Sequence, residues 1–168
     1  MDEMTRGVFL FQIERQAKFL LMTMAQLEAA LTRHADDETW YAIQAAVIAA
    51  RNLSKLFWPR KAYAERGRDL RQVLEVDETS WIASFRRLRN HFEHFDERIE
   101  SWPQSDVSMV DLSAVPADIL FTAYRAQFMR NLDTDTFSVL FGHDRYPLPP
   151  LVDEVRVILD RLVKLRGW

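Results

Sequence analysis

The sequence contains no cysteine and only 4 glycines and 6 prolines in 168 residues. Without thiols the chain has no disulfide framework, no zinc site of the cysteine type and no cysteine nucleophile. The sequence also has neither a GxGxxG nor a P-loop pattern, so it does not predict a nucleotide-binding loop. It lacks an apolar run of the roughly 20 residues that span a membrane, and its acidic first residues do not fit a signal peptide. We therefore expect a cytoplasmic protein with no membrane partner.

The composition that remains is typical of one globular domain. Hydrophobic residues make up 48% and charged residues 28% of the chain, which excludes a disordered protein. The length predicts a single domain over residues 1–168. The formal net charge of −3 excludes a protein that coats nucleic acid by bulk charge.

The first third of the chain predicts two antiparallel helices. Apolar residues recur at intervals of three and four from Leu10 to Leu31, which is the spacing of one helix face. Asp36 and Asp37 are N-cap candidates for a second helix that begins near Glu38. This helix is expected to end at Trp58, because a residue before proline disfavours the helical conformation.

Two further helices follow from the same periodicity. Asp77 is the expected cap of a third helix that Pro103 ends, and its seam consists of Trp81, Phe85, Leu88, Phe92, Phe95 and Ile99. Prolines at 147, 149 and 150 break the chain before a final helix, whose seam consists of Leu151, Val155, Ile158, Leu162 and Leu165.

The region between these helices predicts a small insertion. Residues 104–117 lack periodicity and indicate a loop. Apolar and polar residues then alternate over 128–132 and 137–141 on either side of the turn residues DTDT, which is the pattern of a β-hairpin. The predicted fold class is thus mainly α, an up-and-down bundle of four or five helices. Its helical core covers about 5–102 and 150–166, and the insertion covers about 104–148.

Residues 51–71 are basic although the whole chain is acidic. Seven Lys and Arg residues face two acidic ones, a local charge of +5 that leaves −8 for the rest. Phe57, Trp58 and Tyr63 lie among these bases, and such a mixture suits phosphate contact and base stacking. The alternative is a solvated loop whose aromatic side chains enter the core. The RNA-binding candidates here are Arg51, Lys55, Arg60 and Lys61.

The third helix places polar residues on the face opposite its seam. At about 100° per residue, Arg86, Asn90 and His94 stack at i, i+4 and i+8, and Arg89 lies beside them. Two of the four histidines in the chain, His91 and His94, occur on this helix. Exposure to solvent alone does not explain why two histidines occur on this helix.

Three kinds of chemistry compete for these histidines. A metal could be shared by His91 and His94, but the Glu-x-x-His partners of such sites are missing. A serine hydrolase could use His143 and Asp144, but no nucleophile elbow is present. The third kind is RNA cleavage without a metal, for which a histidine serves as base and an arginine holds the phosphate.

The segment Arg89-Asn90-His91-Phe92-Glu93-His94 resembles the R-x(4–6)-H motif of HEPN domains, in which a small polar residue often follows the arginine. The order of helices is also similar. HEPN domains are helical bundles found in toxin–antitoxin, abortive-infection and CRISPR-associated ribonucleases. The resemblance implies a metal-independent endoribonuclease without a cofactor, in which Arg89 contacts the phosphate, His94 acts as acid or base and Asn90 orients them.

The resemblance also implies a homodimer, because two motif helices usually meet across a two-fold axis in that family. Arg86 is then expected near the axis as a further RNA contact, and a cognate antitoxin is a possible second partner. In this chain Asp96 replaces the aromatic residue that often lies two positions after the histidine, and Glu93 and Glu97 flank the motif. These differences keep a second hypothesis open, a catalytically silent HEPN-like module for dimerisation or binding.

Overall fold

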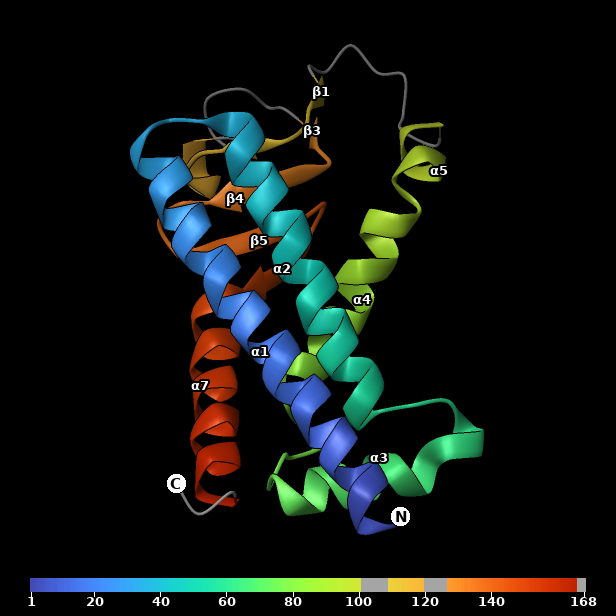
Figure 1. The fold of residues 1–168 in the computed structure, drawn as a ribbon. Helices are drawn as coiled ribbons and strands as arrows, with labels where there is room; N and C mark the ends of the chain where they lie inside the picture. The colour runs from blue at the N-terminus through green and yellow to red at the C-terminus, as the bar shows by residue number, and fades with distance from the viewer. Residues whose placement is uncertain (101–108, 120–126, 166–168) are drawn as a thin grey trace.

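The fold, seen in a computed structural model that describes residues 1–100, 109–119 and 127–165, is mainly helical with a small sheet. Four long helices lie side by side and run in alternating directions, and the sheet packs at one end of them (Figure 1). The mainly α fold class is therefore confirmed. In the part of the chain that the structure describes, no helix combines the length and the apolar character needed to cross a membrane.

The first two helices form the predicted antiparallel pair. α1 spans Glu3–Thr32 and α2 spans Asp36–Phe57. The side chain of Asp2 caps α1 by accepting a hydrogen bond of 2.8 Å from the backbone of Thr5. α2 ends before Pro59, as predicted, but Asp36 and Asp37 lie in its first turn and do not cap it. There they still oppose the positive end of the helix dipole.

A short 3₁₀ helix, Lys61–Tyr63, and the helix α3, Ala64–Val73, follow α2. The sequence did not predict them, because the many charged residues of this segment hide its helical period. A bidentate ion pair joins α3 to α1, since the guanidinium of Arg6 donates to both oxygens of Asp69 at 2.9 and 3.0 Å. This pairing raises the pKa of Arg6.

The third helix is predicted correctly to Glu93 and is helical again from Phe95, but the prediction of one continuous helix is wrong at His94. The helix is divided into α4, Trp81–Glu93, and α5, Phe95–Glu100, with His94 as the C-cap of α4. Its N-cap is Ser80, whose hydroxyl accepts a hydrogen bond from the backbone of Ile82 at 3.1 Å. Asp77 instead accepts two bonds of 2.8 Å from Thr79, which hold the pKa of Asp77 below its usual value.

The predicted hairpin is confirmed and extends into a sheet. β4, Arg130–Asp133, and β5, Ser138–Phe141, pair antiparallel around the turn residues. β6, Asp144–Pro147, adds to β5, and the short β2, Ser113–Ala114, adds to β4 in parallel. β1, Met109–Val110, pairs separately with β3, Gln127–Phe128. Residues 104–108 of the predicted loop 104–117 and residues 120–126 before the hairpin lie outside the described residues. The described part of that loop, residues 109–117, contains the short strands β1 and β2, which the sequence did not predict.

The last helix, α7, begins earlier than predicted, at Leu148, and ends at Leu165. Pro149 and Pro150 lie in its first turn, where no backbone donor is required, so they start the helix and do not precede it. The seam residues from Leu151 to Leu162 are buried, whereas Leu165 is exposed.

The sheet is part of the main core. Leu132, Val139 and Tyr146 are buried in one cluster with residues of α1, α2, α4 and α7. Phe85 of α4 meets Tyr146 edge to face at 5.9 Å. The segment predicted as an insertion thus closes one end of the helical core.

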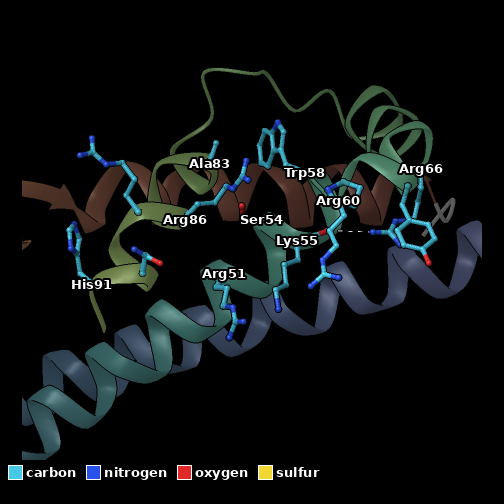
Figure 2. Close-up of a pocket in the computed structure, with 13 residues that line it drawn as sticks. Arg51, Ser54, Lys55, Trp58, Arg60, Arg66, Ala83, Arg86 and His91 are labelled. Atoms are coloured by element: carbon cyan, nitrogen blue, oxygen red, sulfur yellow. Dashed lines mark hydrogen bonds between the residues drawn. The ribbon is translucent and has the colours of Figure 1, made fainter. Parts of the chain in front are cut away.

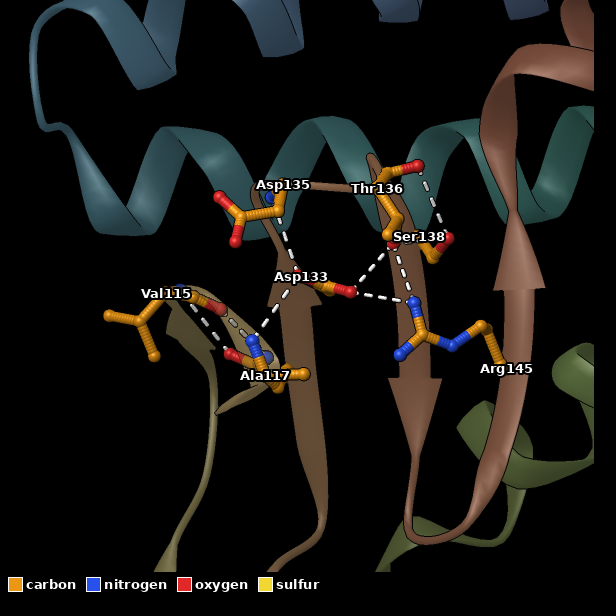
Figure 3. Close-up of polar contacts among 8 residues, drawn as sticks. Val115, Ala117, Asp133, Asp135, Thr136, Ser138 and Arg145 are labelled. Carbon is orange, nitrogen blue, oxygen red and sulfur yellow. Dashed lines mark hydrogen bonds and ion pairs between the residues drawn. The ribbon is translucent and has the colours of Figure 1, made fainter. Parts of the chain in front are cut away.

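A buried carboxylate organises the loops of this sheet (Figure 3). The side chain of Asp133 is 2% exposed and accepts hydrogen bonds from the backbone of Ala117 and of Asp135, at 3.2 and 3.3 Å. It accepts two stronger bonds of 2.6 Å from the hydroxyl of Thr136 and the guanidinium of Arg145. Asp133 therefore links the loop after β2, the β4–β5 turn and β6.

Candidate nucleic-acid interface

A groove of about 1130 Å³ lies between α2, α4 and the segment that connects α2 to α3 (Figure 2). Six of its lining side chains are cationic: Arg51, Lys55, Arg60, Arg66, Arg86 and Arg87. None of the described residues that line it is acidic. Such a concentration of positive charge favours a polyanionic ligand.

The two long walls of the groove follow from helical spacing. Arg51, Lys55 and Trp58 recur at intervals of four and three and so share one face of α2 and its C-cap. The face of α4 that lines the groove carries residues at intervals of three and four: Ala83, then Arg86 and Arg87, then Asn90. Because α2 packs against α4, these two polar faces converge.

The cations of the groove differ in how far they are neutralised. Arg51 pairs with Glu93 at 3.0 Å, and Arg87 lies 3.6 Å from the carboxylate of Asp144. In the described parts of the chain, no carboxylate lies within ion-pair distance of Arg60 or Arg86. These two arginines, from opposite walls, are the side chains most available to an anion.

Three buried polar atoms in the groove lack a hydrogen-bond partner among the residues that the structure describes. They are Nε of Arg51, Nε of Arg66 and Oγ of Ser54. Ser54 is 1% exposed and lines the groove. These three atoms have almost no accessible surface, so they lie beneath the surface of the groove.

Aromatic side chains lie at the α3 end of the groove. The indole of Trp58 donates a 2.9 Å hydrogen bond to Glu78 and lies under the guanidinium of Arg71 at 5.4 Å, so its position is well determined. Tyr63 is 59% exposed and stacks with Arg66 at 5.4 Å. Of the three aromatic residues in the basic segment, only Phe57 enters the core completely.

A close approach of two backbones supports this end of the groove. A Cβ atom on Gly67 of α3 would lie 2.5 Å from the carbonyl oxygen of Phe57 and 2.5 Å from Cδ of Pro59. Neither the backbone nor the proline ring can move aside easily. Glycine at this position therefore lets α3, and Arg66 with it, lie against the end of α2.

We expect Gly67→Ala to destabilise the protein by about 1–3 kcal/mol, because overpacking outweighs the better helix propensity of alanine. Thermal unfolding checks this, with a fall in Tm of about 2–4 °C for each kcal/mol. Gly7→Ala is the matched control, since a Cβ there meets nothing within 4 Å in the interior of α1. It should be neutral or stabilising by up to about 1 kcal/mol, and equal Tm values for the two variants would contradict the argument.

The motif residues are distributed unequally around the groove. Asn90 is exposed and lines it together with Arg86. Arg89 belongs to α4, but its side chain lies outside the described part of the structure. His94 does not line the groove, and its Nδ1 lies 3.0 Å from a carboxylate oxygen of Glu97. The predicted i, i+4, i+8 stack is thus wrong at its last member, because α4 ends before His94.

His91 has a role in packing that the sequence did not predict. It is 9% exposed, and its ring stacks on Phe141 of β5 with the centroids 4.4 Å apart. Its Nε2 lies 3.2 Å from a carboxylate oxygen of Asp144. His91 and His94 therefore have different partners, and in the described residues no group of three His, Asp or Glu side chains is arranged to hold a metal. Asp144, a candidate for a hydrolase triad with His143, instead joins the sheet to α4.

The sequence found most of the groove but not all of it. Arg51, Lys55, Arg60, Arg86 and Asn90 line one groove, whereas Lys61 is exposed outside its lining. Arg66, Arg87 and Ser54 were missed as site residues. Arg66 is one of the seven bases of the run 51–71, which was the available signal for it. The position of Arg87 next to Arg86 was the signal for Arg87.

The concave surface also lies within one chain. The resemblance implied that the third helix, with Arg86, meets the same helix of a second subunit. In the structure, α2 of the same chain forms the opposite wall. Comparison with known proteins adds no relative, because no family model, no curated protein and no solved structure matches this chain.

Proposed function

We propose that this protein binds RNA in the groove between α2 and α4 and cleaves it without a metal ion or cofactor. The observation that carries the proposal is the convergence of six cationic side chains on a groove that includes Asn90. Asn90 belongs to the segment that resembles the HEPN motif. The alternating long helices are compatible with a HEPN-like bundle.

The proposed reaction is attack of a ribose 2′-oxygen on the adjacent phosphorus. His94 accepts the proton of the 2′-hydroxyl, or donates a proton to the departing 5′-oxygen, as the P–O5′ bond breaks. Arg89 stabilises the charge that develops on the phosphate, and Asn90 orients the reacting groups. The products are a 2′,3′-cyclic phosphate and a 5′-hydroxyl. A toxin–antitoxin or phage-defence system, with a cognate antitoxin as partner, is the setting we propose for this activity.

A second candidate function is RNA binding without cleavage. The position of His94 favours it, because this side chain pairs with Glu97 and does not line the groove. A HEPN-like module of this kind would use the same cations but would not transfer a proton.

Incubation of single-stranded RNA with the purified chain in EDTA distinguishes the two candidates. For the enzyme we expect cyclic phosphate ends, and we expect His94→Ala and Arg89→Ala to reduce cleavage at least about 100-fold, the range of general acid–base contributions. His143→Ala, an exposed histidine on the β5–β6 turn, is the control and should retain full activity. Binding without cleavage by the unaltered chain would support the silent module, and absence of binding would contradict both.

A further inference from the structure

The outer face of α1 carries an apolar stripe that nothing in the described residues covers. It consists of Met4, Val8, Phe11, Phe19 and Met22, which are between 42% and 83% exposed. With Arg15 included, the intervals are four, three, four, four and three residues. Their average is the repeat of an α-helix, so the stripe runs straight along the helix.

The opposite face of α1 already forms the core. Ile13, Leu20 and Leu27 are fully buried there, against α2 and α7. α1 is thus apolar on two opposite faces over most of its length. Large contiguous apolar patches are rare on the surfaces of monomeric proteins and mark interaction sites, which indicates that the outer face is covered in the functional protein.

Two exposed side chains of α2 extend the stripe sideways. Tyr41 and Ile48 are 70% and 55% exposed. Tyr41 lies against the C-terminal part of α1, where it shares a shallow depression with Gln26 and Ala29. Figure 1 shows the two helices side by side over their length. We call the stripe of α1 and these two residues of α2 the outer face.

We propose that the outer face is the contact between two copies of this chain. Three of its seven large side chains are aromatic, with about 200 Å² each, and the seven side chains, all between 42% and 83% exposed, together present on the order of 700 Å². A standard protein interface buries about 800 Å² on each partner. The outer face therefore supplies nearly all the area that a stable dimer needs.

The composition of the outer face also fits a protein interface. Aromatic residues, Met and Arg are enriched at interface cores, whereas Lys, Glu and Asp are depleted. The charged member of the α1 stripe is Arg15, whose guanidinium lies 6.0 Å from the ring of Phe11 and 5.8 Å from that of Phe19. The faces of the two rings thus attract this guanidinium, at the roughly 6 Å limit of a cation–π contact.

A second copy fits this face better than a membrane does. Helices that lie on membranes carry Lys and Arg beside their apolar face. Beside this stripe the charges cancel, because Lys18 pairs with Glu14 at 2.6 Å, and Gln12 and Gln16 are neutral. A two-fold contact requires a surface that matches itself, and a straight apolar stripe whose one charged member is Arg15 meets that condition when two α1 helices pack antiparallel.

The oligomeric state of the full chain tests the proposal, independently of any RNA. We expect the unaltered protein to be a dimer at micromolar concentration by light scattering. We expect Phe11→Glu to raise the dimer Kd at least about tenfold while the far-UV CD spectrum stays unchanged. Val163→Glu, at an exposed apolar position of α7, is the matched control and should remain a dimer.

The absence of native cysteine permits a second readout. Arg15→Cys lies near the middle of the stripe and should form a disulfide-linked dimer under mild oxidation, whereas Val163→Cys should not. A monomeric unaltered chain, or a dimer that Phe11→Glu does not weaken, would overturn the proposal. A monomer that sediments with anionic vesicles would also overturn it, in favour of a membrane.

Discussion

Replacing Arg60 and Arg86 together by glutamate is expected to weaken RNA binding about 100-fold. The two side chains enter the groove from opposite walls, and in the described residues neither pairs with a carboxylate. Their replacement therefore removes phosphate contacts without breaking an ion pair of the fold. Fluorescence anisotropy with a labelled single-stranded RNA measures the change.

The salt dependence gives a sharper criterion than the affinity alone. Each phosphate contact to a single strand contributes about 0.7 to the slope of log K against log salt, so the double variant should lower this slope by about 1.4. The matched control is Arg156→Glu with Lys164→Glu, which changes the charge equally on α7, away from the groove. If both double variants lose affinity and slope alike, net charge and not the groove governs binding.

Asp133→Ala is expected to destabilise the fold more than Gly67→Ala does. It removes four hydrogen bonds to a carboxylate that is 2% exposed and leaves the backbone donors of Ala117 and Asp135 without their acceptor. A cost of about 3 kcal/mol follows, or a fall in Tm of about 6–12 °C for a chain of this size. Asp135→Ala is the control, because that neighbouring side chain is exposed.

The same carboxylate predicts a dependence of stability on pH. Burial by itself raises the pKa of Asp133, but the hydrogen bonds from Thr136, Arg145 and the backbone outweigh it and hold this pKa below its usual value of 3.8. The ionised carboxylate of Asp133 therefore stabilises the folded state fully above pH 3.8. This contribution is lost as the pH falls through the lower pKa that Asp133 has in the folded state. In thermal melts at decreasing pH, the Tm difference between the unaltered chain and Asp133→Asn should shrink below about pH 4. A difference that stays constant down to pH 2.5 would contradict this assignment.

Periodicity predicted the long helices because each buries one apolar stripe against its neighbours. This is why the predictions of α1, α2 and α7 are confirmed. The hairpin was identified by a different pattern, the alternation of apolar and polar residues. The same reasoning failed beyond Glu93, where the apolar seam continues in the sequence but the core does not. Phe95, 42% exposed, lies on the guanidinium of Arg130 at 5.4 Å, and Arg130 pairs with Asp111. A seam residue next to an ion pair gains little free energy from burial. Apolar burial therefore does not stabilise a continuous helix through His94.

The sequence predicted many residues of the candidate site but not the surface that they form together. The basic run at 51–71 and the polar face of the third helix are visible in the sequence, because charge and helical phase are local properties. The role of His91 was not, since its stacking partner Phe141 lies 50 residues further along the chain. The buried face of α1 was predicted correctly, because Ile13, Leu20 and Leu27 belong to the seam between Leu10 and Leu31 and are fully buried. The second, exposed stripe of α1 was not predicted.

By itself, the sequence determined that the chain is helical, that it carries a local excess of positive charge and that Arg86 and Asn90 share a face. The tertiary structure alone decided that this face meets the basic face of α2, that His94 leaves it and that the sheet completes the core. The physical reason is that local geometry sets which side chains share a helix face. Which faces meet depends on the burial of apolar surface over the whole chain, and that burial brings together residues far apart in the sequence.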